Sequence, residues 1–293
     1  MRAAKAEKPS GPTPQAPSRL ALSNGGALDL TFVGAGSAFS KKFFQNNLLA
    51  VKGKDHLLID FGTRASEALA LLGLGVADIS NFLITHLHAD HIGGLEEAML
   101  INHFALHRKG NIVVADRLRK NLWSMSLRGG ASFNEERDGA FLEFEDFWDS
   151  IATRRIKGAD RELCEARIGG IEARLFRTMH IPDSSQGWAS SFPSYGVILD
   201  RRVLFTSDTR YDPAMVISLD EEYGFEVIFH DCQLFKGGVH ASLDELAGLP
   251  PEVRAKTRLM HYGDKIEDFR QRIEDLGFAG IVEQWKTYSF PHA

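Results

Sequence analysis

The stretch Thr85-His86-Leu87-His88-Ala89-Asp90-His91-Ile92-Gly93-Gly94 decides how this chain is interpreted. It places three imidazoles and one carboxylate within six residues, directly after the apolar run Phe82-Leu83-Ile84. Imidazoles and carboxylates are side chains that bind Zn²⁺-like divalent ions in proteins. A single histidine is more often a hydrogen-bonded structural residue, but packing alone does not explain so dense a group. The motif therefore predicts a metal site at the end of a buried strand.

The spacing within the motif predicts two adjacent metal positions. In an irregular turn after a strand, the alternate residues His86 and His88 point to one side, and Asp90 and His91 turn towards a second position. Such a cluster needs partners from elsewhere in the chain. The candidates share a place at the end of an apolar, strand-like run, where an α/β scaffold carries its chemistry on connecting loops. They are Asp60, His180, Asp208 and His261.

The rest of the chain alternates strand-like and helical patterns. Strand patterns cover residues 28–33, 47–51, 56–60, 82–85 and 111–115, dominate 168–205, and return at 227–230 and 258–261. Helical patterns cover 66–72, 95–107, 116–128, 242–247 and 266–276. The alternation predicts one layered α/β domain with mixed sheets over residues 27–293. Residues 132–150 are irregular, acidic and aromatic, which favours a solvated edge element with some aromatic side chains packed inward over a lid that faces the substrate.

Composition limits the setting and the partners of the chain. Its 293 residues are 44% hydrophobic and 25% charged, as in an ordinary globular protein. No apolar stretch reaches the roughly 20 residues needed to cross a bilayer, so no membrane partner is predicted. Residues 1–26 are rich in proline and lack the apolar core of a secretory signal, which predicts a flexible tail. Cys164 and Cys232 are the only cysteines, which favours a reducing cytoplasm, and the net charge of −5 argues against a long nucleic-acid footprint.

The order Asp60, His86-x-His88-x-Asp90-His91, His180, Asp208, His261 resembles the five motifs of the metallo-β-lactamase superfamily. The resemblance covers almost all of the chain beyond the tail. It implies an α/β fold, the αββα sandwich of two mixed sheets flanked by helices, and two divalent ions, Zn²⁺ or Mn²⁺. By position, one ion would be bound by His86, His88 and His180, and the other by Asp90, His91 and His261. Asp208 would bridge the two ions, and Asp60 would orient a ligand from behind.

Segments in the second half resemble ribonuclease Z-like enzymes of this superfamily. They are Pro193-Ser194-Tyr195-Gly196, Phe205-Thr206-Ser207-Asp208-Thr209, His230-Asp231, His240-Ala241-Ser242 and Leu259-Met260-His261-Tyr262. Such enzymes cleave phosphodiesters, and His240 would protonate the leaving oxygen while Asp231 orients its ring. Asp90, Asp231 and His240 are therefore the predicted catalytic residues. Two alternatives stay open: His240 as a surface histidine before a helix capped by Ser242, and Tyr195 as a core residue rather than a phosphate contact.

The substrate is predicted from what the chain lacks and from a second resemblance. The tRNA-processing members carry a basic, Gly- and Pro-rich arm that has no counterpart here. The segments 93–97 and 126–130 are instead similar to armless relatives, the anti-Pycsar-type phosphodiesterases, which open 3′,5′-cyclic nucleotides. A cyclic nucleotide is the favoured substrate, with Trp188 or Phe192 stacking on its base. The alternatives are RNA, through tRNA 3′-end processing, and a thioester or lactam. The resemblance also implies a homodimer.

Overall fold

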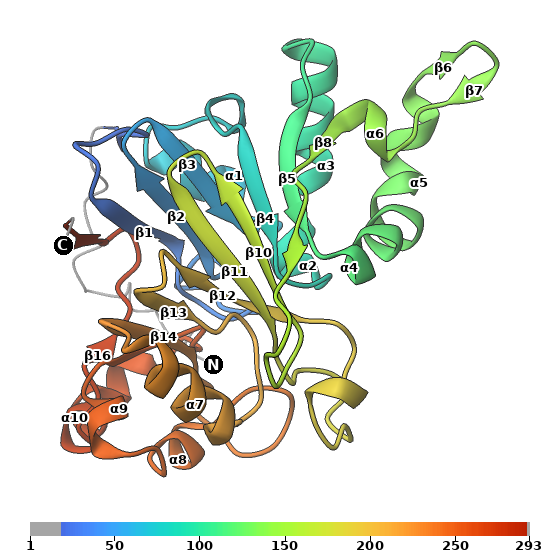
Figure 1. Cartoon of the computed structure of the whole chain (residues 1–293). Helices are drawn as coiled ribbons and strands as arrows, with labels where there is room; N and C mark the ends of the chain where they lie inside the picture. Colours follow the sequence, from blue (N-terminus) through green and yellow to red (C-terminus); the bar gives the residue numbers. More distant parts are fainter. Residues whose placement is uncertain (1–18, 292–293) are drawn as a thin grey trace, which may run out of the picture.

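Two β-sheets packed face to face form the centre of the molecule, whose computed structural model describes residues 19–291 (Figure 1). The first sheet contains seven strands in the order β17 (Thr287–Phe290), β1 (Leu28–Gly34), β2 (Asn47–Lys52), β3 (Asp55–Ile59), β4 (Asn81–Ile84), β5 (Gly110–Val114) and β8 (Trp148–Ser150). The second contains eight in the order β16 (Gly280–Ile281), β15 (Thr257–Met260), β14 (Val227–Asp231), β13 (Val203–Phe205), β12 (Tyr195–Leu199), β11 (Ile171–Arg177), β10 (Leu163–Ile168) and β9 (Arg154–Arg155).

Both sheets are mixed, and their parallel strands determine where the loops gather. Strands β1 to β3 are antiparallel neighbours, whereas β3, β4, β5 and β8 run parallel. The second sheet is antiparallel from β9 to β13 and parallel from β13 to β16. Because parallel neighbours end at the same edge of a sheet, the loops after β3 and β4, and those after β13, β14 and β15, lie together.

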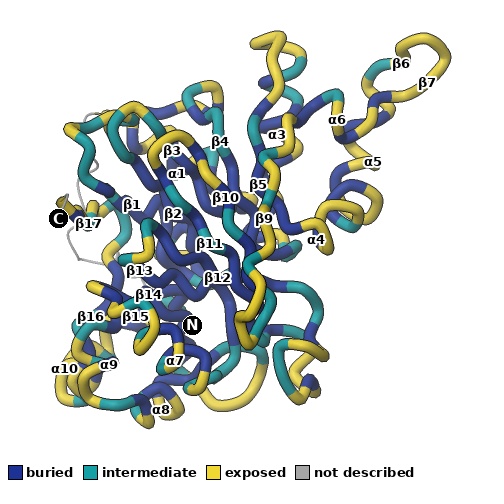
Figure 2. The backbone as a smooth tube through the Cα atoms, in the orientation of Figure 1, coloured by how far each residue is buried: buried dark blue, intermediate teal, exposed yellow. Residues whose placement is uncertain are grey.

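Apolar side chains fill the space between the two sheets. The Phe32 ring of β1 meets the Phe229 ring of β14 edge-on at a centroid distance of 4.9 Å, and lies 6.3 Å from the Phe205 ring of β13. All three are fully buried, and the central strands are dark blue over most of their length in Figure 2. Each such burial stabilises the fold by about 1.5–3 kcal/mol. Two mixed sheets flanked by helices confirm the predicted sandwich.

Short helices flank the sandwich or project from it: α1 (Ala65–Leu71), α2 (Ala89–Ile92), α3 (Leu95–Leu100), α4 (Asp116–Asn121), α5 (Arg128–Ala131), α6 (Phe144–Phe147), α7 (Pro213–Tyr223), α8 (Leu243–Leu246), α9 (Pro251–Arg254) and α10 (Arg270–Asp275). The helices predicted at 95–107 and 116–128 change to π-helical turns at 101–105 and 122–127. Helix α7 was not predicted. The Asp212 carboxylate caps its start by accepting from the Met215 N–H at 3.1 Å, and Gly224 ends it with φ of 62°.

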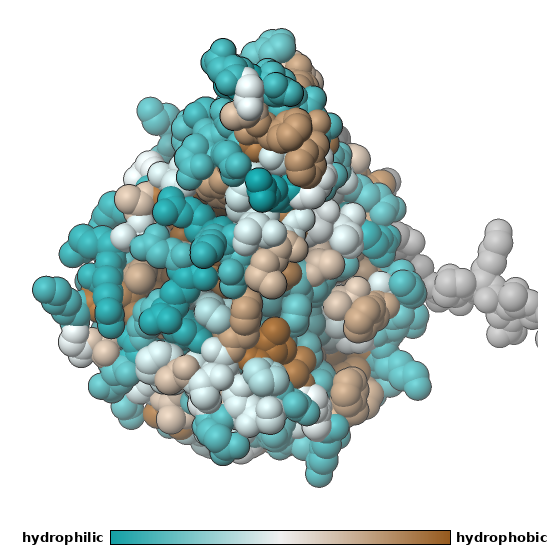
Figure 3. Space-filling view, turned by 90° about the vertical axis from the view of Figure 1, so that its right-hand side faces the viewer, coloured by the Kyte–Doolittle hydropathy of each residue, from teal (hydrophilic) through white to brown (hydrophobic). Residues whose placement is uncertain are grey.

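The acidic, aromatic segment between β5 and β8 projects from the sandwich. Helices α5 and α6 and the small hairpin of β6 (Glu136–Arg137) and β7 (Ala140–Phe141) stand away from the sheets at the upper right of Figure 1. Within this projection, Phe144 and Phe147 of α6 are buried, whereas Phe133 and Phe141 are exposed. Figure 3, seen from that side, shows brown apolar atoms within the mostly teal surface at its top. The prediction of an edge element with some aromatics packed inward is confirmed.

Of the predicted tail, residues 1–26, the first 18 residues lie outside the described part of the chain. Its last part lies against the domain. The Leu20 N–H donates to the Leu72 carbonyl at 2.8 Å, and the Asn24 side chain donates to Asp29 at 2.7 Å and accepts from the Gly53 N–H at 2.7 Å. Nowhere in residues 19–291 is there a helix with the length and apolar character needed to cross a membrane.

Candidate metal centre

The predicted ligands come from the ends of strands in both sheets. Asp60 follows β3, His86 follows β4, Asp208 lies just beyond β13 and His261 follows β15. His180 lies beyond β11, which runs in the same direction as β13 because β12 is antiparallel to both. The topology therefore brings chain segments far apart in sequence to one edge of the sandwich. All seven predicted ligands lie there, as the prediction from strand ends required.

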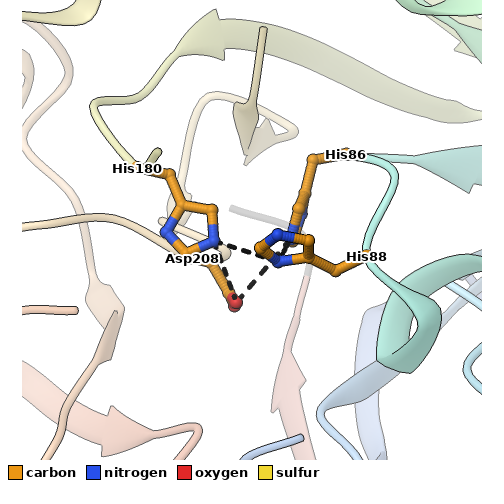
Figure 4. Close-up of side chains that lie close together, drawn as sticks. All are labelled: His86, His88, His180 and Asp208. Atoms are coloured by element: carbon orange, nitrogen blue, oxygen red, sulfur yellow. Dashed lines mark hydrogen bonds and ion pairs between the residues drawn. The ribbon is translucent and has the colours of Figure 1, made fainter. Parts of the chain in front are cut away.

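The first group consists of His86, His88, His180 and Asp208, whose side chains converge in Figure 4. The His88 Nδ1 lies 3.1 Å from the His86 Nε2 and 3.2 Å from the His180 Nε2. The Asp208 Oδ2 lies 3.8 Å from the Nε2 atoms of both His86 and His180. The His180 ring is held from behind by the Val239 carbonyl, 2.9 Å from its Nδ1. Three imidazole nitrogens and one carboxylate oxygen thus face a common point.

The second group consists of Asp90, His91, Asp208 and His261. The His91 Nε2 lies 3.2 Å from the Asp90 Oδ2 and 3.3 Å from the Asp208 Oδ2. The His261 Nε2 lies 3.4 Å from each of the same two oxygens. Asp208 belongs to both groups, so its Oδ2 has the position expected of a bridging ligand.

The two groups differ in their electrostatics, and each could hold a divalent ion. Burial lowers the pKa of His86 well below its usual value and that of His180 to about 4, so both imidazoles are neutral at pH 7 and offer lone pairs. In the second group, the His91 Nε2 and the Asp208 Oδ1 are buried without a hydrogen-bond partner among the described residues. Burial lowers the pKa values of His91 and His261, but the neighbouring Asp208 charge outweighs burial and raises both well above their usual value, so an ion bound there would displace a proton from each imidazole. Unpaired buried polar atoms are costly, and an ion held by His91 would satisfy its Nε2.

Asp60 and Thr85 support His91 from behind. The fully buried Asp60 carboxylate lies 2.7 Å from the His91 Nδ1 through its Oδ2. It also accepts the Thr85 N–H on Oδ1 at 2.9 Å and the Thr85 hydroxyl on Oδ2 at 2.7 Å. A carboxylate in this position fixes the proton of His91 on Nδ1 and leaves Nε2 free to bind a metal. Sequence reasoning found Asp60 but missed Thr85, which has no signal beyond its place before His86.

His240 and Asp231 form a pair beside the two groups. The His240 Nδ1 lies 2.7 Å from the Asp231 Oδ2, which also accepts the Thr209 N–H at 2.9 Å. The Asp231 Oδ1 lies 3.4 Å from the Nδ1 of His261. Burial lowers the pKa of His240, but the Asp231 charge and hydrogen bond outweigh burial and raise the pKa overall. His240 is therefore anchored to the cluster, unlike the surface histidine of the alternative interpretation.

Strained backbone and close packing shape the site. Asp60, Ser207 and His261 adopt positive φ of 63°, 51° and 58°, each at a cost of about 1–3 kcal/mol. Gly62 touches the motif: a Cβ there would lie 2.1 Å from the Asp90 carbonyl oxygen. The motif loop therefore packs directly on the loop after β3. The sequence contains no signal for the positive φ values, although Gly62 marks the close approach.

Three aromatic or imidazole residues named in the sequence analysis lie away from the reactive atoms. Tyr195 is buried and donates to the Glu162 carboxylate at 2.7 Å, so the core interpretation is the correct one. His230 is buried with its Nδ1 2.7 Å from the Asp231 carbonyl, as a structural residue. The Trp188 ring lies beside the guanidinium groups of Arg161 and Arg177, at 5.9 and 5.8 Å.

A pocket of about 670 Å³ opens beside the metal centre and is lined by His240 and His261. Its apolar lining comes from Phe39, Leu234, Phe235, Val239 and Phe269. Trp188 and Phe192, the predicted stacking residues, are not among the described residues that line this pocket. Phe39 and Phe235 line it, and the sequence gives no signal for this because single exposed aromatic residues in loops have no periodic pattern.

Comparison with known proteins extends the resemblance to the whole domain. The family described as "Anti-Pycsar protein Apyc1" matches residues 28–288. The chain belongs to this family. An Anti-Pycsar protein Apyc1 from Paenibacillus harenae is 38% identical over 262 residues, covering 89% of this chain and 99% of that protein. One from Bacillus phage vB_BsuM-Goe3 is 40% identical over 264 residues, covering 85% and 95%.

A solved structure supports the fold of this Anti-Pycsar family member. The metallo-β-lactamase fold protein YhfI from Bacillus subtilis superposes with a TM-score of 0.63 at 15% identity, covering 90% of this chain and 99% of YhfI. At that identity the likeness concerns the fold alone. Together, the family match and the superposition confirm both the superfamily resemblance and the sandwich fold.

Proposed function

We propose that this chain is a dinuclear metallohydrolase that opens 3′,5′-cyclic nucleotides. The observation that carries the proposal is the convergence of two ligand groups on Asp208, with the His240–Asp231 pair beside them. A thioester or lactam hydrolase would need the ligands but not a hydrogen-bonded acid next to them. Membership of the anti-Pycsar family supports a cyclic nucleotide in particular.

Different residues of the chain would bind the metal ions and protonate the leaving group. His86, His88 and His180 would hold one ion, Asp90, His91 and His261 the other, and Asp208 both. Two divalent ions held there would supply a nucleophile at neutral pH and offset charge on the phosphate. His240 donates its proton to the leaving ribose oxygen from Nε2, because its Nδ1 is bound to Asp231. Asp231 fixes the ring and stabilises the imidazolium, and its second oxygen lies beside His261.

The surface charge supports a small substrate over RNA. The projection between β5 and β8 carries exposed acidic residues, among them Glu136, Asp138, Glu143 and Glu145, together with exposed basic residues such as Arg119, Arg128 and Arg137. Carboxylates repel a phosphate backbone, and long RNA contacts require many Lys and Arg side chains. This projection is therefore of mixed charge and is not the strongly basic arm that long RNA contacts require.

Zn²⁺, with Mn²⁺ as the alternative, a homodimeric state and a cytoplasmic location belong to the same proposal. The ligand set accepts either metal, so availability decides between them. Both cysteines are free and buried, which supports a reducing compartment. Metal analysis of protein purified without added metal, and light scattering of the same sample, test the first two statements.

The decisive experiment incubates metal-loaded protein with 3′,5′-cyclic nucleotides of each base, with a precursor tRNA carrying a 3′ trailer, and with a chromogenic lactam. Asp208→Ala is the blank. Opening of the cyclic phosphate by the wild type alone supports the proposal. Trailer removal with the cyclic nucleotides untouched would support the ribonuclease Z-like alternative, and lactam turnover alone would support the third class.

A further inference from the structure

The geometry points to a nucleobase-binding site made by the side chains of Phe39 and Phe235, in the pocket beside the metal centre. This inference rests on the proposed function, since it concerns the part of the substrate that lies away from the phosphate. The pocket holds about 670 Å³, within the range of about 300–1,000 Å³ usual for small-molecule sites. Because His240 and His261 line it, a ligand whose phosphate lies at the metal centre would extend into it.

The two rings are unusually exposed. Phe39 is 86% exposed and Phe235 69% exposed; among the other large apolar side chains of residues 19–291, only Met125 and Phe133 are more than half exposed, at 76% and 61%. Leaving a phenylalanine ring in water forgoes the free energy that its burial would contribute. Exposed aromatic residues that flank one pocket are typical of a binding site. The apolar, flat part of a cyclic nucleotide is its base, which can cover such rings.

The loop that carries Phe39 is fastened to the segment that carries His261. The Asp264 carboxylate accepts the Lys41 N–H at 3.0 Å and the Lys42 N–H at 3.1 Å, and it accepts the Ser40 hydroxyl at 2.5 Å. The Ser37 N–H donates to the Tyr262 carbonyl at 2.9 Å. Phe39 is therefore held at a defined place relative to a metal ligand, although its ring is free.

The loop that carries Phe235 is fastened to the other side of the centre. Its base is closed by the Gln233 N–H, which donates to the Ala241 carbonyl at 2.8 Å. Its far end includes Val239, whose carbonyl holds His180. Between them, Gly237 and Gly238 have φ of 83° and 89°, a conformation that side chains other than glycine rarely adopt. Phe235 thus lies on a loop whose far end contacts the metal centre through Val239 and His180.

This arrangement predicts how the enzyme chooses among substrates. Stacking on aromatic rings tolerates every base, because every base has a π-face. The lining of the pocket is mostly apolar and offers few groups to read the edge of a base. The two rings therefore discriminate nucleotides from phosphodiesters without a base, and they discriminate weakly between bases.

The test compares Phe39→Ala, Phe235→Ala and the conservative Phe39→Trp with the wild type. Phe133→Ala, a 61% exposed ring on the projection, is the matched control. Steady-state kinetics are measured on 3′,5′-cyclic nucleotides and on 1-O-methylribose 3′,5′-cyclic phosphate, which has no base. Equilibrium binding is measured with slowly hydrolysed cyclic phosphorothioates. Each alanine variant is expected to raise KM and Kd for nucleotides about tenfold, with kcat little changed, and Phe39→Trp to restore them. The preference for nucleotide over the baseless analogue should fall in parallel.

The outcomes separate this inference from the proposed function. If the wild type opens cyclic nucleotides and the alanine variants keep the wild-type KM and preference, the base site is wrong and the function stands. If binding depends on the two rings but no cyclic nucleotide is opened, the base site is supported and the reaction is not. If the wild type neither binds nor opens these nucleotides, both are overturned.

Discussion

Replacing Asp60 with Asn should weaken metal binding at the second group, because it changes which nitrogen of His91 carries the proton. The Thr85 N–H donates to the Asp60 Oδ1, so the oxygen of an Asn side chain must stay at that position. The new NH₂ group then faces His91, where the carboxylate now accepts the Nδ1 proton at 2.7 Å. His91 must accept there instead, its proton moves to Nε2, and Nε2 can no longer bind a metal.

The magnitude follows from what the substitution leaves intact. His86, His88 and His180 do not contact Asp60, so the first group keeps its imidazole ligands. The second group keeps Asp90, Asp208 and His261 but loses one imidazole. Removing a supporting carboxylate behind a metal-binding histidine typically lowers metal affinity 10- to 100-fold, or about 1.4–2.7 kcal/mol. We expect one ion to bind nearly as in the wild type and the other to bind 10- to 100-fold more weakly.

Metal content at a series of buffered free Zn²⁺ concentrations, measured by mass spectrometry, gives both affinities. Asp200→Asn is the control, because it changes a largely buried carboxylate that pairs with Lys52 at 2.6 Å, away from the metal centre. Thermal unfolding in chelator checks that both variants are folded. If both metal affinities are unchanged in Asp60→Asn, Asp60 does not determine which nitrogen of His91 is protonated. If both affinities fall equally, the effect is not confined to the second group.

Three further predictions concern packing, proton transfer and pH. Gly62→Ala should lower the free energy of unfolding by about 1–3 kcal/mol in urea titrations, because its Cβ would lie 2.1 Å from the Asp90 carbonyl; Gly187→Ala, with open space around it, should be neutral. His240→Gln should lower kcat for cyclic nucleotides about 10²- to 10⁴-fold with metal content unchanged, and unaltered turnover would exclude His240 as the acid. Burial lowers the pKa of His56 below 6.5, and its Nε2 accepts the Ser80 N–H at 3.0 Å. The stabilising contribution of neutral His56 is therefore present above pH 6.5, the pKa in the unfolded chain, and is lost as the pH falls through the lower pKa of His56 in the folded protein. In chelator, the urea midpoint should fall more between pH 7.5 and 5 for the wild type than for His56→Gln; equal falls would contradict this.

Many of the strands and the expectation of metal chemistry could be predicted from the amino-acid sequence, whereas helix α7 could not. Local periodicity showed the strands from 28 to 60 within a residue or two, because the turn at 52–55 and the alternation of buried residues depend on near neighbours only. The dense His and Asp motif after β4 predicted a metal site, and the strand-end rule selected the residues that the structure brings together beside it. These inferences needed no knowledge of which strands are neighbours.

How these residues come together could be seen only in the folded chain. Asp90 and His261 are 171 residues apart, and Ser40 and Asp264 are 224 apart, yet each pair is in contact. Such contacts depend on sheet order and on backbone turns such as the positive φ of Asp60 and His261. Asp231 between His240 and His261, and the two rings of Phe39 and Phe235 beside the same pocket, arise in this way. Their physical cause is the meeting of two sheet edges, which no local pattern in the chain encodes.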